Sequence, residues 1–211
     1  MQNRMHSKKA YKVCRRLGAG VYDKCQTQKF ALSEARHERG GKGGGRRRTL
    51  SDYGKQLLEK QRVRFAYGIS EKQLRRYNAE AQRVAVLGND PAARMLEQLE
   101  MRIDNIVYRA GLAPTRRAAR QMVSHGHVQI NGVRTTVPSA TLKEGDTFSL
   151  RERTKKLPIL DAVRERAAQT TLPAWLNFDT EKWEGTVLAR PTPENTEMPG
   201  SIPVILEFYS R

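Results

Sequence analysis

The most regular hydrophobic pattern in the chain lies between residues 91 and 110. Its apolar members recur at alternating spacings of three and four, at Leu96, Leu99, Ile103, Ile106 and Ala110. This spacing places them on one face of an α-helix. Asp90 and Pro91 are residue types favoured at a helix N-cap and at the first helical position, and Gly111 is a typical stop. The pattern predicts a single helix over this stretch with one buried face.

Two more helices are expected on the N-terminal side of this stretch. Ser51 opens a helical segment that runs to about residue 66, with Gly68 as its stop. Ser70 is followed three residues later by Gln73, which is the arrangement of a capping box. A second helix is therefore expected over residues 71–86.

A short helix at residues 115–125 separates apolar from cationic side chains. Thr115 is its expected N-cap and Gly126 its end. With roughly 100° per residue, one face holds Ala118, Ala119, Met122 and Val123. The opposite face holds Arg117, Arg120, Gln121 and Ser124, with Arg116 at its edge. The helix is expected to pack on one side and to present guanidinium and amide groups on the other.

The next residues alternate at the period of β-strands. Asn131-Gly132 lies between two such runs, at 128–130 and 133–137, and this dipeptide favours a hairpin with a type I′ turn. Phe148 and Leu150 alternate as a further strand. Residues 102–150 thus predict two helices packed on a small twisted antiparallel sheet. Together with the helices before it, this gives an α+β protein.

Charge indicates the kind of partner. The chain of 211 residues has 39 Lys and Arg against 22 Asp and Glu, a formal net charge of +17. Such self-repulsion brings no advantage to a free enzyme, whereas a polyanion would neutralise it. Nucleic acid fits best, because each phosphate met by Lys or Arg releases counterions.

The charge is uneven, and its distribution suggests domains. Residues 1–50 hold 14 Lys and Arg against 3 Asp and Glu and are expected to form a mostly irregular basic arm, followed by a helical domain at 51–100 and an RNA-binding domain at 101–153. Residues 171–211 hold 3 against 6. The C-terminal tail, residues 154–211, is therefore expected to fold back on the N-terminal part. Its expected anchors are Trp175, Phe178 and Trp183, and residues 204–208 are a candidate strand.

Candidate RNA contacts outside the 101–153 domain are cations in two settings. A Gly-rich segment offers Lys42, Arg46, Arg47 and Arg48. The helices at 51–86 offer Lys55, Arg62, Arg64, Tyr67, Lys72, Arg75 and Arg76. Cations interleaved with tyrosines suit phosphate contact and base stacking. A solvated helix face with Tyr67 and Tyr77 in the core explains the same residues equally well.

Within residues 101–153, side chains with forked or polar groups are the candidates. They are Arg102, Asn105, Arg109, Thr115, Arg116, Arg117, Arg120, Gln121, Ser124, His125, His127 and Asn131. Arginine can fork onto phosphate oxygens, and the others can hydrogen-bond sugar or phosphate. Asp104 is expected to orient a nearby arginine rather than to touch RNA. The two histidines are the weaker candidates, because a histidine beside a turn often only packs.

These runs resemble a known family. Residues 102–113, RIDNIVYRAGLA, and 115–128, TRRAARQMVSHGHV, followed by Asn131-Gly132, resemble the alpha-L RNA-binding domain. That domain also occurs in pseudouridine synthases and in a tRNA synthetase, so alone it indicates only RNA binding. Residues 67–77, YGISEKQLRRY, the preceding SDY at 51–53 and the ending VILEFYSR are similar to the bacterial small-subunit ribosomal protein S-four family.

The resemblance implies a structural role on the ribosome. Members of that family bind a helix junction in the 5′ domain of 16S rRNA early and nucleate assembly of the 30S body. They lie near the channel by which mRNA enters, contact ribosomal protein S-five and influence decoding accuracy, and some repress their own operon.

The cysteines depart from that family's pattern. Many members carry four N-terminal cysteines that bind zinc, whereas this chain has only Cys14 and Cys25, with His6 and His37 nearby in sequence. A Cys-x10-Cys spacing lacks the close pairs of structural zinc sites. We expect no cofactor and two ordinary thiols without a disulfide framework.

Two other classes of function would need different features in the sequence. An RNA-modifying enzyme would need a catalytic domain, but no GxxxxGK[ST] or HExxH motif is present and residues 154–211 are too few. The chain is therefore not expected to be an enzyme. A free regulator of mRNA or DNA remains compatible with a ribosomal role, and co-sedimentation with washed 30S particles separates the two. No run of about 18 apolar residues and no secretory signal is present, so a cytoplasmic, ribosomal location without membrane contact is expected.

Overall fold

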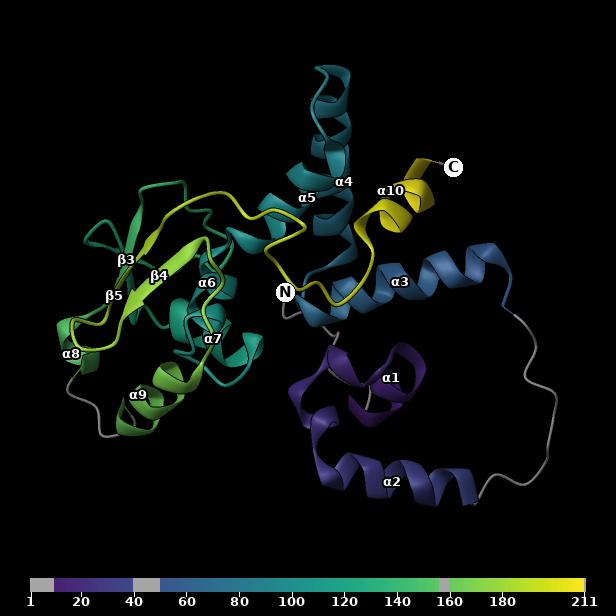
Figure 1. Cartoon of the computed structure of the whole chain (residues 1–211), viewed down its shortest axis with the longest axis horizontal. Coiled ribbons are helices and arrows are strands. Elements are labelled where there is room, and N and C mark those ends of the chain that lie inside the picture. The colour runs from purple at the N-terminus through teal and green to yellow at the C-terminus, as the bar shows by residue number, and fades with distance from the viewer. Residues whose placement is uncertain (1–9, 40–49, 156–159, 211) are drawn as a thin grey trace. The chain divides into compact units, whose positions relative to one another are not determined.

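The computed structural model describes residues 10–39, 50–155 and 160–210. The chain forms two compact units, Met1–Glu80 with Met198–Arg211 and Ala81–Glu197 (Figure 1). Helices dominate the first unit, and the second combines helices with an antiparallel sheet. The expected α+β class is confirmed.

The N-terminal part of the first unit is helical where an irregular arm was expected. It contains α1 (Ala10–Leu17), two 3-10 turns (Ala19–Val21 and Asp23–Gln26) and α2 (Gln28–Arg39). Its apolar residues are few but clustered. Buried Val13, Leu17 and Val21 form one group, against which Leu58 and Phe65 pack. The expectation of an irregular arm is therefore wrong for residues 10–39, because this small core supports helices despite the high charge.

Helices α3 (Asp52–Ala66) and α4 (Glu71–Val86) follow the predicted bounds. The Ser51 hydroxyl accepts a hydrogen bond from the Gly54 amide at 3.2 Å, and the Ser70 hydroxyl accepts one from the Gln73 amide at 3.2 Å. These side chains satisfy amides that lack partners within a helix. Gly68, the expected stop of α3, has φ +62°, which is the left-handed conformation typical of a glycine that ends a helix.

The C-terminal segment is a helix, and its prediction as a strand is wrong. Helix α10 (Ile202–Ser210) packs against α3 and buries Ile202, Ile205 and Leu206. These residues are spaced as one helical face. A short apolar run has no period that separates a strand from a buried helix, so the packing surface of α3 decides.

A buried cation joins α3, α4 and α10. The Lys60 ammonium, 7% exposed, donates to the Glu71 carboxylate at 2.7 Å and lies 4.5 Å from the centre of the Phe208 ring. The Tyr209 hydroxyl donates to the same carboxylate at 2.7 Å. Burial opposes ionisation of Glu71, but the hydrogen bonds from Lys60 and Tyr209 outweigh it and hold its pKa below the usual value. Lys60 therefore serves the fold of this unit rather than its surface.

In the second unit, the predicted long helix is two helices, α5 (Pro91–Glu100) and α6 (Ile103–Arg109). The Leu142 amide donates to the Met101 carbonyl at 2.9 Å, and the Ile103 amide donates to the Ala140 carbonyl at 2.8 Å. Arg102 between them is extended, at φ −72° and ψ 138°. Pairing with residues 140–142 replaces helical hydrogen bonds there, so the prediction of one helix is wrong at this point. The apolar face continues across the break and remains buried.

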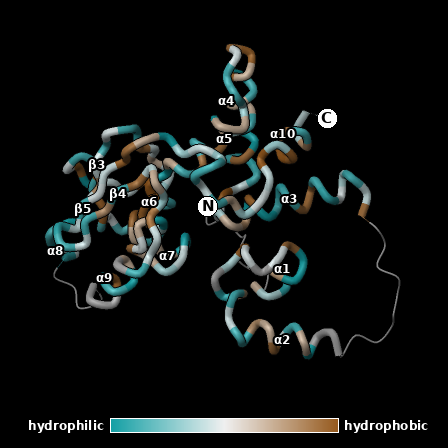
Figure 2. The backbone as a smooth tube through the Cα atoms, in the orientation of Figure 1, coloured by the Kyte–Doolittle hydropathy of each residue, from teal (hydrophilic) through white to brown (hydrophobic). Residues whose placement is uncertain are grey.

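Helix α7 (Arg116–Ser124) and the hairpin follow the sequence pattern. The strands are β1 (Val128–Ile130), β2 (Val133–Thr135) and β3 (Thr147–Leu150). Asn131 and Gly132 have φ of +48° and +77°, as a type I′ turn requires. The helix packs its apolar face into the core of the unit, and Figure 2 shows hydrophobic residues gathered along α6 beside it.

Most of the C-terminal tail belongs to the second unit. After α8 (Glu152–Lys155) and α9 (Leu160–Gln169), strands β4 (Leu176–Asp179) and β5 (Glu184–Val187) complete an antiparallel sheet of order β2-β1-β3-β5-β4. Trp175 is fully buried in this unit, and Phe178 stacks on Phe148 at 5.8 Å. Only residues from 198 onward join the first unit. The expectation that all of 154–211 folds back on the N-terminal part is therefore wrong, because the aromatic anchors fill the sheet's own core.

Candidate nucleic-acid interface

Helix α7 presents a polar face to solvent. Ala119 and Val123 on its other face are fully buried, whereas Arg117, Gln121 and Ser124 are exposed. The Thr115 hydroxyl caps the helix by accepting a hydrogen bond from the Ala118 amide at 3.1 Å. The predicted division of faces is confirmed, and the Thr115 hydroxyl serves the helix cap.

A buried carboxylate holds two of the candidate arginines. Asp104, with a side chain only 6% exposed, accepts from Arg102 Nε and Nη2 at 2.9 and 2.7 Å. It also accepts from Arg120 Nε and Nη2 at 2.9 and 2.8 Å. The side chain of Arg102 is 4% exposed, and that of Arg120 is 34% exposed. The expected orienting role of Asp104 agrees with this geometry, whereas Arg102 is buried inside the fold and offers almost no surface to a ligand.

A second buried carboxylate holds another cation. Glu100 has no exposed surface and accepts from Arg109 Nε at 3.1 Å and Nη2 at 2.8 Å. It also accepts from the Asn105 amide at 2.8 Å. Arg109 Nη2 donates in addition to the Glu197 carbonyl at 2.8 Å. Asn105 is therefore buried and bonded inside the fold, although it was expected among the surface contacts.

Arg116 completes this network. Its Nε donates to the Asn105 side-chain oxygen at 2.8 Å, and its guanidinium lies 4.4 Å from the centre of the Tyr108 ring. A guanidinium held by an amide and an aromatic face keeps a fixed orientation. The carboxylates and the ring thus fix the directions of several arginines before any ligand arrives.

The turn after α7 gathers further cations. The guanidinium of Arg134 lies directly over Gly126, where a side chain would collide with it, and Arg151 Nη1 donates to the Gly126 carbonyl at 3.4 Å. His127 Nδ1 is 3.0 Å from the Thr154 hydroxyl, and its ring lies 6.1 Å from that of His125. Burial, and after it the charges of His125, Arg151 and Arg134, lower the pKa of His127. His125 is exposed and His127 is half-buried.

Arg134 and Arg151 are not among the residues that the sequence pattern singles out. Arg134 lies in β2 and Arg151 directly follows β3. The predicted hairpin pairs Arg134 with Gln129. This register places Arg134 beside Gly126, at the end of α7.

Asn131 has a structural task in the hairpin. Its side-chain nitrogen donates to Asp146 at 2.9 Å, and its side-chain oxygen accepts from the Thr147 amide at 2.8 Å. The hydrogen bond from Asn131, followed by the one from the Lys143 amide, lowers the pKa of Asp146. Asn131 remains exposed but already uses both ends of its amide.

The cations of the first unit divide between surface and interior. Lys55, Lys72, Arg75 and Arg76 are exposed. Arg62 is 36% exposed and donates to Glu59 at 2.6 Å and to the Leu17 carbonyl at 2.7 Å. Arg64 is 17% exposed and lies 3.6 Å from Glu71. Their exposure favours Lys55, Lys72, Arg75 and Arg76 as RNA contacts.

Both tyrosines lie in the core. Tyr67 is 3% exposed, with its hydroxyl 3.0 Å from the Met198 sulfur, and Tyr77 is 6% exposed. Of the two interpretations left open by the sequence, the structure supports packing rather than stacking on bases. The candidates Lys42, Arg46, Arg47 and Arg48 lie outside the described residues.

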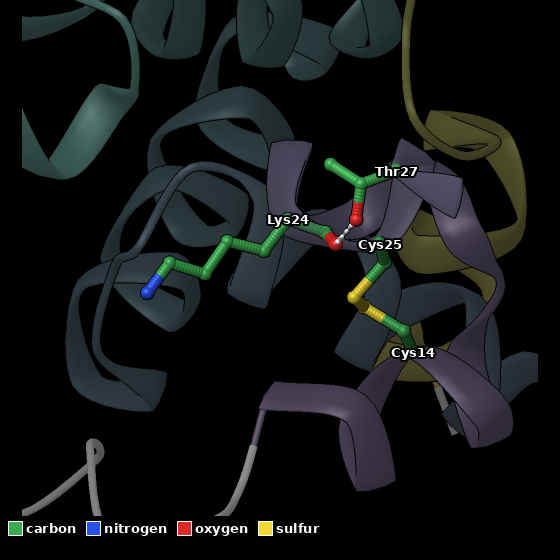
Figure 3. Close-up of a disulfide and its surroundings, with 4 residues drawn as sticks. All are labelled: Cys14, Lys24, Cys25 and Thr27. Carbon is green, nitrogen blue, oxygen red and sulfur yellow. Dashed lines mark hydrogen bonds between the residues drawn. A yellow bond between two sulfur atoms is a disulfide. The ribbon is translucent and has the colours of Figure 1, made fainter. Parts of the chain in front are cut away.

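The cysteines form a disulfide. Cys14 of α1 and Cys25 of the second 3-10 turn are bonded and buried beside Phe30 (Figure 3). The expectation of two free thiols is wrong, because the turn at residues 18–24 brings their Cα atoms within 6.3 Å. Among the described residues no group of three or more His, Cys, Asp or Glu is arranged to hold a metal ion. Over the same residues, no helix is both long and apolar enough to cross a bilayer.

Comparison with known proteins covers nearly the whole chain. Residues 5–100 match the family described as the ribosomal protein S4/S9 N-terminal domain, and residues 101–148 match the S4 domain. The small ribosomal subunit protein uS4 of Syntrophomonas wolfei is 41% identical over 201 residues, covering 94% of this chain and 95% of that protein. The chain belongs to the uS4 family.

Other members agree with this assignment. The uS4 proteins of Pelotomaculum thermopropionicum and Halothermothrix orenii are 39% and 41% identical, each over 95% of this chain and 96% of their own length. The S4 domain coincides with α6, α7 and the hairpin, where the alpha-L resemblance was found. The family is one of ribosomal structural proteins and not of enzymes, which confirms that expectation.

Proposed function

We propose that this chain is a structural protein of the small ribosomal subunit that binds 16S rRNA directly. The observation that carries the proposal is the exposed polar face of α7, where Arg117, Gln121 and Ser124 face solvent on a helix anchored by buried residues. RNA presents a deep major groove that excludes helices, so proteins read its backbone, 2′-hydroxyls and unpaired bases. Exposed guanidinium and amide groups on a rigid helix can hydrogen-bond such backbone and sugar groups.

Charge supports the same ligand. The net charge is +17, and the cations around α7 and the Gly126 turn come from α6, α7, β2 and the end of β3. Arg109, Arg116 and Arg120 are each oriented by a buried acceptor, Glu100, Asn105 and Asp104 respectively. Their ordering cost is met during folding, which favours affinity for a pre-shaped site.

The finer role rests on family membership and on the motifs it shares. We infer that the chain binds early at a helix junction in the 5′ domain of 16S rRNA and nucleates the 30S body. By the same resemblance it contacts ribosomal protein S-five and mRNA near the channel by which mRNA enters, and it influences decoding accuracy. A cytoplasmic location on the ribosome follows from these partners.

Titration of RNA affinity against salt tests the proposal. The full chain should bind a 16S rRNA transcript, and Arg117→Ala should weaken binding and reduce the slope of log affinity against log salt by about 0.9. Arg120→Ala should act in the same direction. Lys182→Ala, at a 77% exposed position in the β4–β5 turn, removes the same charge elsewhere and serves as the control. Equal slopes for Arg117→Ala and Lys182→Ala would count against the α7 face.

Assembly tests the finer role. Reconstitution of 30S particles without this protein should stall before the other body proteins join, and adding the purified chain should restore them. If particles formed equally well without it, the proposed nucleating role would be refuted while direct RNA binding could still stand.

A further inference from the structure

The first unit contains a cavity that the α7 interface does not use. It lies between α1 and α3 and has a volume of about 430 Å³. Its apolar wall is formed by Val13, Leu17, Leu57, Leu58 and Phe65. Val13 and Leu17 are buried in the small core of this unit, so the wall is part of the packed fold.

The remaining lining residues are cationic or amide-bearing. Lys12 and Arg16 are exposed and lie one turn apart on α1, while Gln61 and Arg64 come from α3. Among the residues that the structure describes, no acidic side chain lines the cavity. Within the part of the chain that the structure describes, neither Lys12 nor Arg16 forms an ion pair.

The lining contains a guanidinium and an aromatic ring that lie close together. The Arg64 guanidinium lies 4.8 Å from the centre of the Phe65 ring and is also held by Glu71 at 3.6 Å. Aromatic rings and guanidinium planes are both groups on which unpaired nucleobases stack in RNA complexes. The cavity therefore combines an apolar space, a guanidinium and an aromatic ring in its lining, and two rim cations, Lys12 and Arg16, that form no ion pair with any described residue.

These features together select a ligand with a flat, mostly apolar group joined to an anion. A cavity of this volume lies within the range of small-ligand sites. We propose that it receives one unpaired nucleotide of the ribosomal RNA, with the base between α1 and α3 and its phosphate at Lys12 and Arg16. This inference rests on the proposed rRNA binding and adds a second point of attachment on the other unit. A hydrophobic protein segment would use the apolar wall but would leave the two rim cations without a counter-charge.

Filling the cavity tests the proposal. Leu57→Trp places an indole where the base would lie, and Leu32→Trp makes the same change at an exposed leucine of α2 in the same unit. Leu57→Trp should lower affinity for the 16S rRNA transcript about ten-fold, the scale of losing one stacked base, and should leave the salt slope unchanged. Leu32→Trp should bind like the wild type. Chemical probing of the complex should show an unpaired nucleotide that is protected by the wild type and reactive with Leu57→Trp.

The rim is tested separately. Lys12→Ala combined with Arg16→Ala should weaken binding and reduce the salt slope by about one to two. Both side chains are exposed, so this double variant should fold normally. If Leu57→Trp lowers the melting temperature, the double variant therefore tests the nucleotide site in its place.

The outcomes are distinct. Wild-type affinity and wild-type protection in both cavity variants would overturn the nucleotide site while leaving rRNA binding by the chain intact. Normal RNA binding by Leu57→Trp with failed incorporation into 30S particles would assign the cavity to a protein partner and overturn the proposal as well. If the wild-type chain did not bind the 16S rRNA transcript, the proposed function itself would be refuted.

Discussion

Removing the negative charge of Asp104 should destabilise the second unit strongly. Its carboxylate accepts four hydrogen bonds from two guanidinium groups, at 2.7 to 2.9 Å. Asp104→Asn keeps one acceptor oxygen and turns an amide donor toward these cations. Arg102, only 4% exposed, then remains as a buried charge without its counter-ion.

The magnitude follows from that burial. Breaking a buried pair by removing one partner costs about 3–5 kcal/mol, and the remaining amide oxygen places the expected loss near the lower end, about 3 kcal/mol. With a urea dependence of about 1.5 kcal/mol per molar, the unfolding midpoint should fall by about 2 M. A loss of this size is a large part of a domain's total stability.

Tryptophan fluorescence during urea unfolding measures this effect. The chain has two tryptophans, and both Trp175 and Trp183 are buried in the second unit, so the signal reports that unit. Glu184→Gln, at an exposed position of β5, removes the same charge and should leave the midpoint nearly unchanged. Asp104→Asn combined with Arg102→Met should cost less than the sum of the single changes, because the guanidinium of Arg102, only 4% exposed, is then removed together with its carboxylate.

An unfolding curve for Asp104→Asn that superimposes on that of the wild type would refute this reasoning. If the losses in free energy of unfolding were strictly additive in the double variant, the coupling between Asp104 and Arg102 would be refuted.

Three further predictions concern other parts of the chain. Ile205→Ala should lower the free energy of unfolding by about 3 kcal/mol, because Ile205 is fully buried against α3; an unchanged denaturation curve followed by circular dichroism would contradict the packing of α10. Iodoacetamide should leave Cys14 and Cys25 unmodified under denaturing conditions until a reductant is added, and mass spectrometry would detect alkylation before reduction if the disulfide were absent. Burial and neighbouring cations depress the pKa of His127 below 6.5, so the unfolded chain binds more protons and stability should fall as pH drops through about 6.5. His127→Gln should flatten this part of the stability–pH curve, and an equal slope in the variant would exclude the histidine as its source.

Elements defined by near neighbours were predictable from the sequence. Ser51, Ser70 and Thr115 cap the helices expected for them, and Asn131-Gly132 forms the expected type I′ turn. Each of these features depends on groups only two or three residues away, so the local residue types suffice. The two faces of α7 were predictable for the same reason, because helical periodicity alone decides them.

The roles of individual arginines depended on the tertiary structure. Arg102 and Arg117 look equally suited to bind phosphate in the sequence, yet the first is buried against Asp104 and the second is exposed. Arg134 reaches Gly126 only through the register of the hairpin. Helical periodicity predicts which face of a helix carries a guanidinium, but it does not predict which carboxylate packs against that face.

The sequence by itself determined α3, α4 and α7 with their caps, the hairpin, the basic character and the family. The tertiary structure decided the break at Arg102, the helical state of residues 202–210, the Cys14–Cys25 bond and the place of β4 and β5 in the sheet. In each of these cases the local residue types do not decide between two conformations or pairings. Contacts with segments distant in sequence, or with a packing partner such as α3, then select one of them.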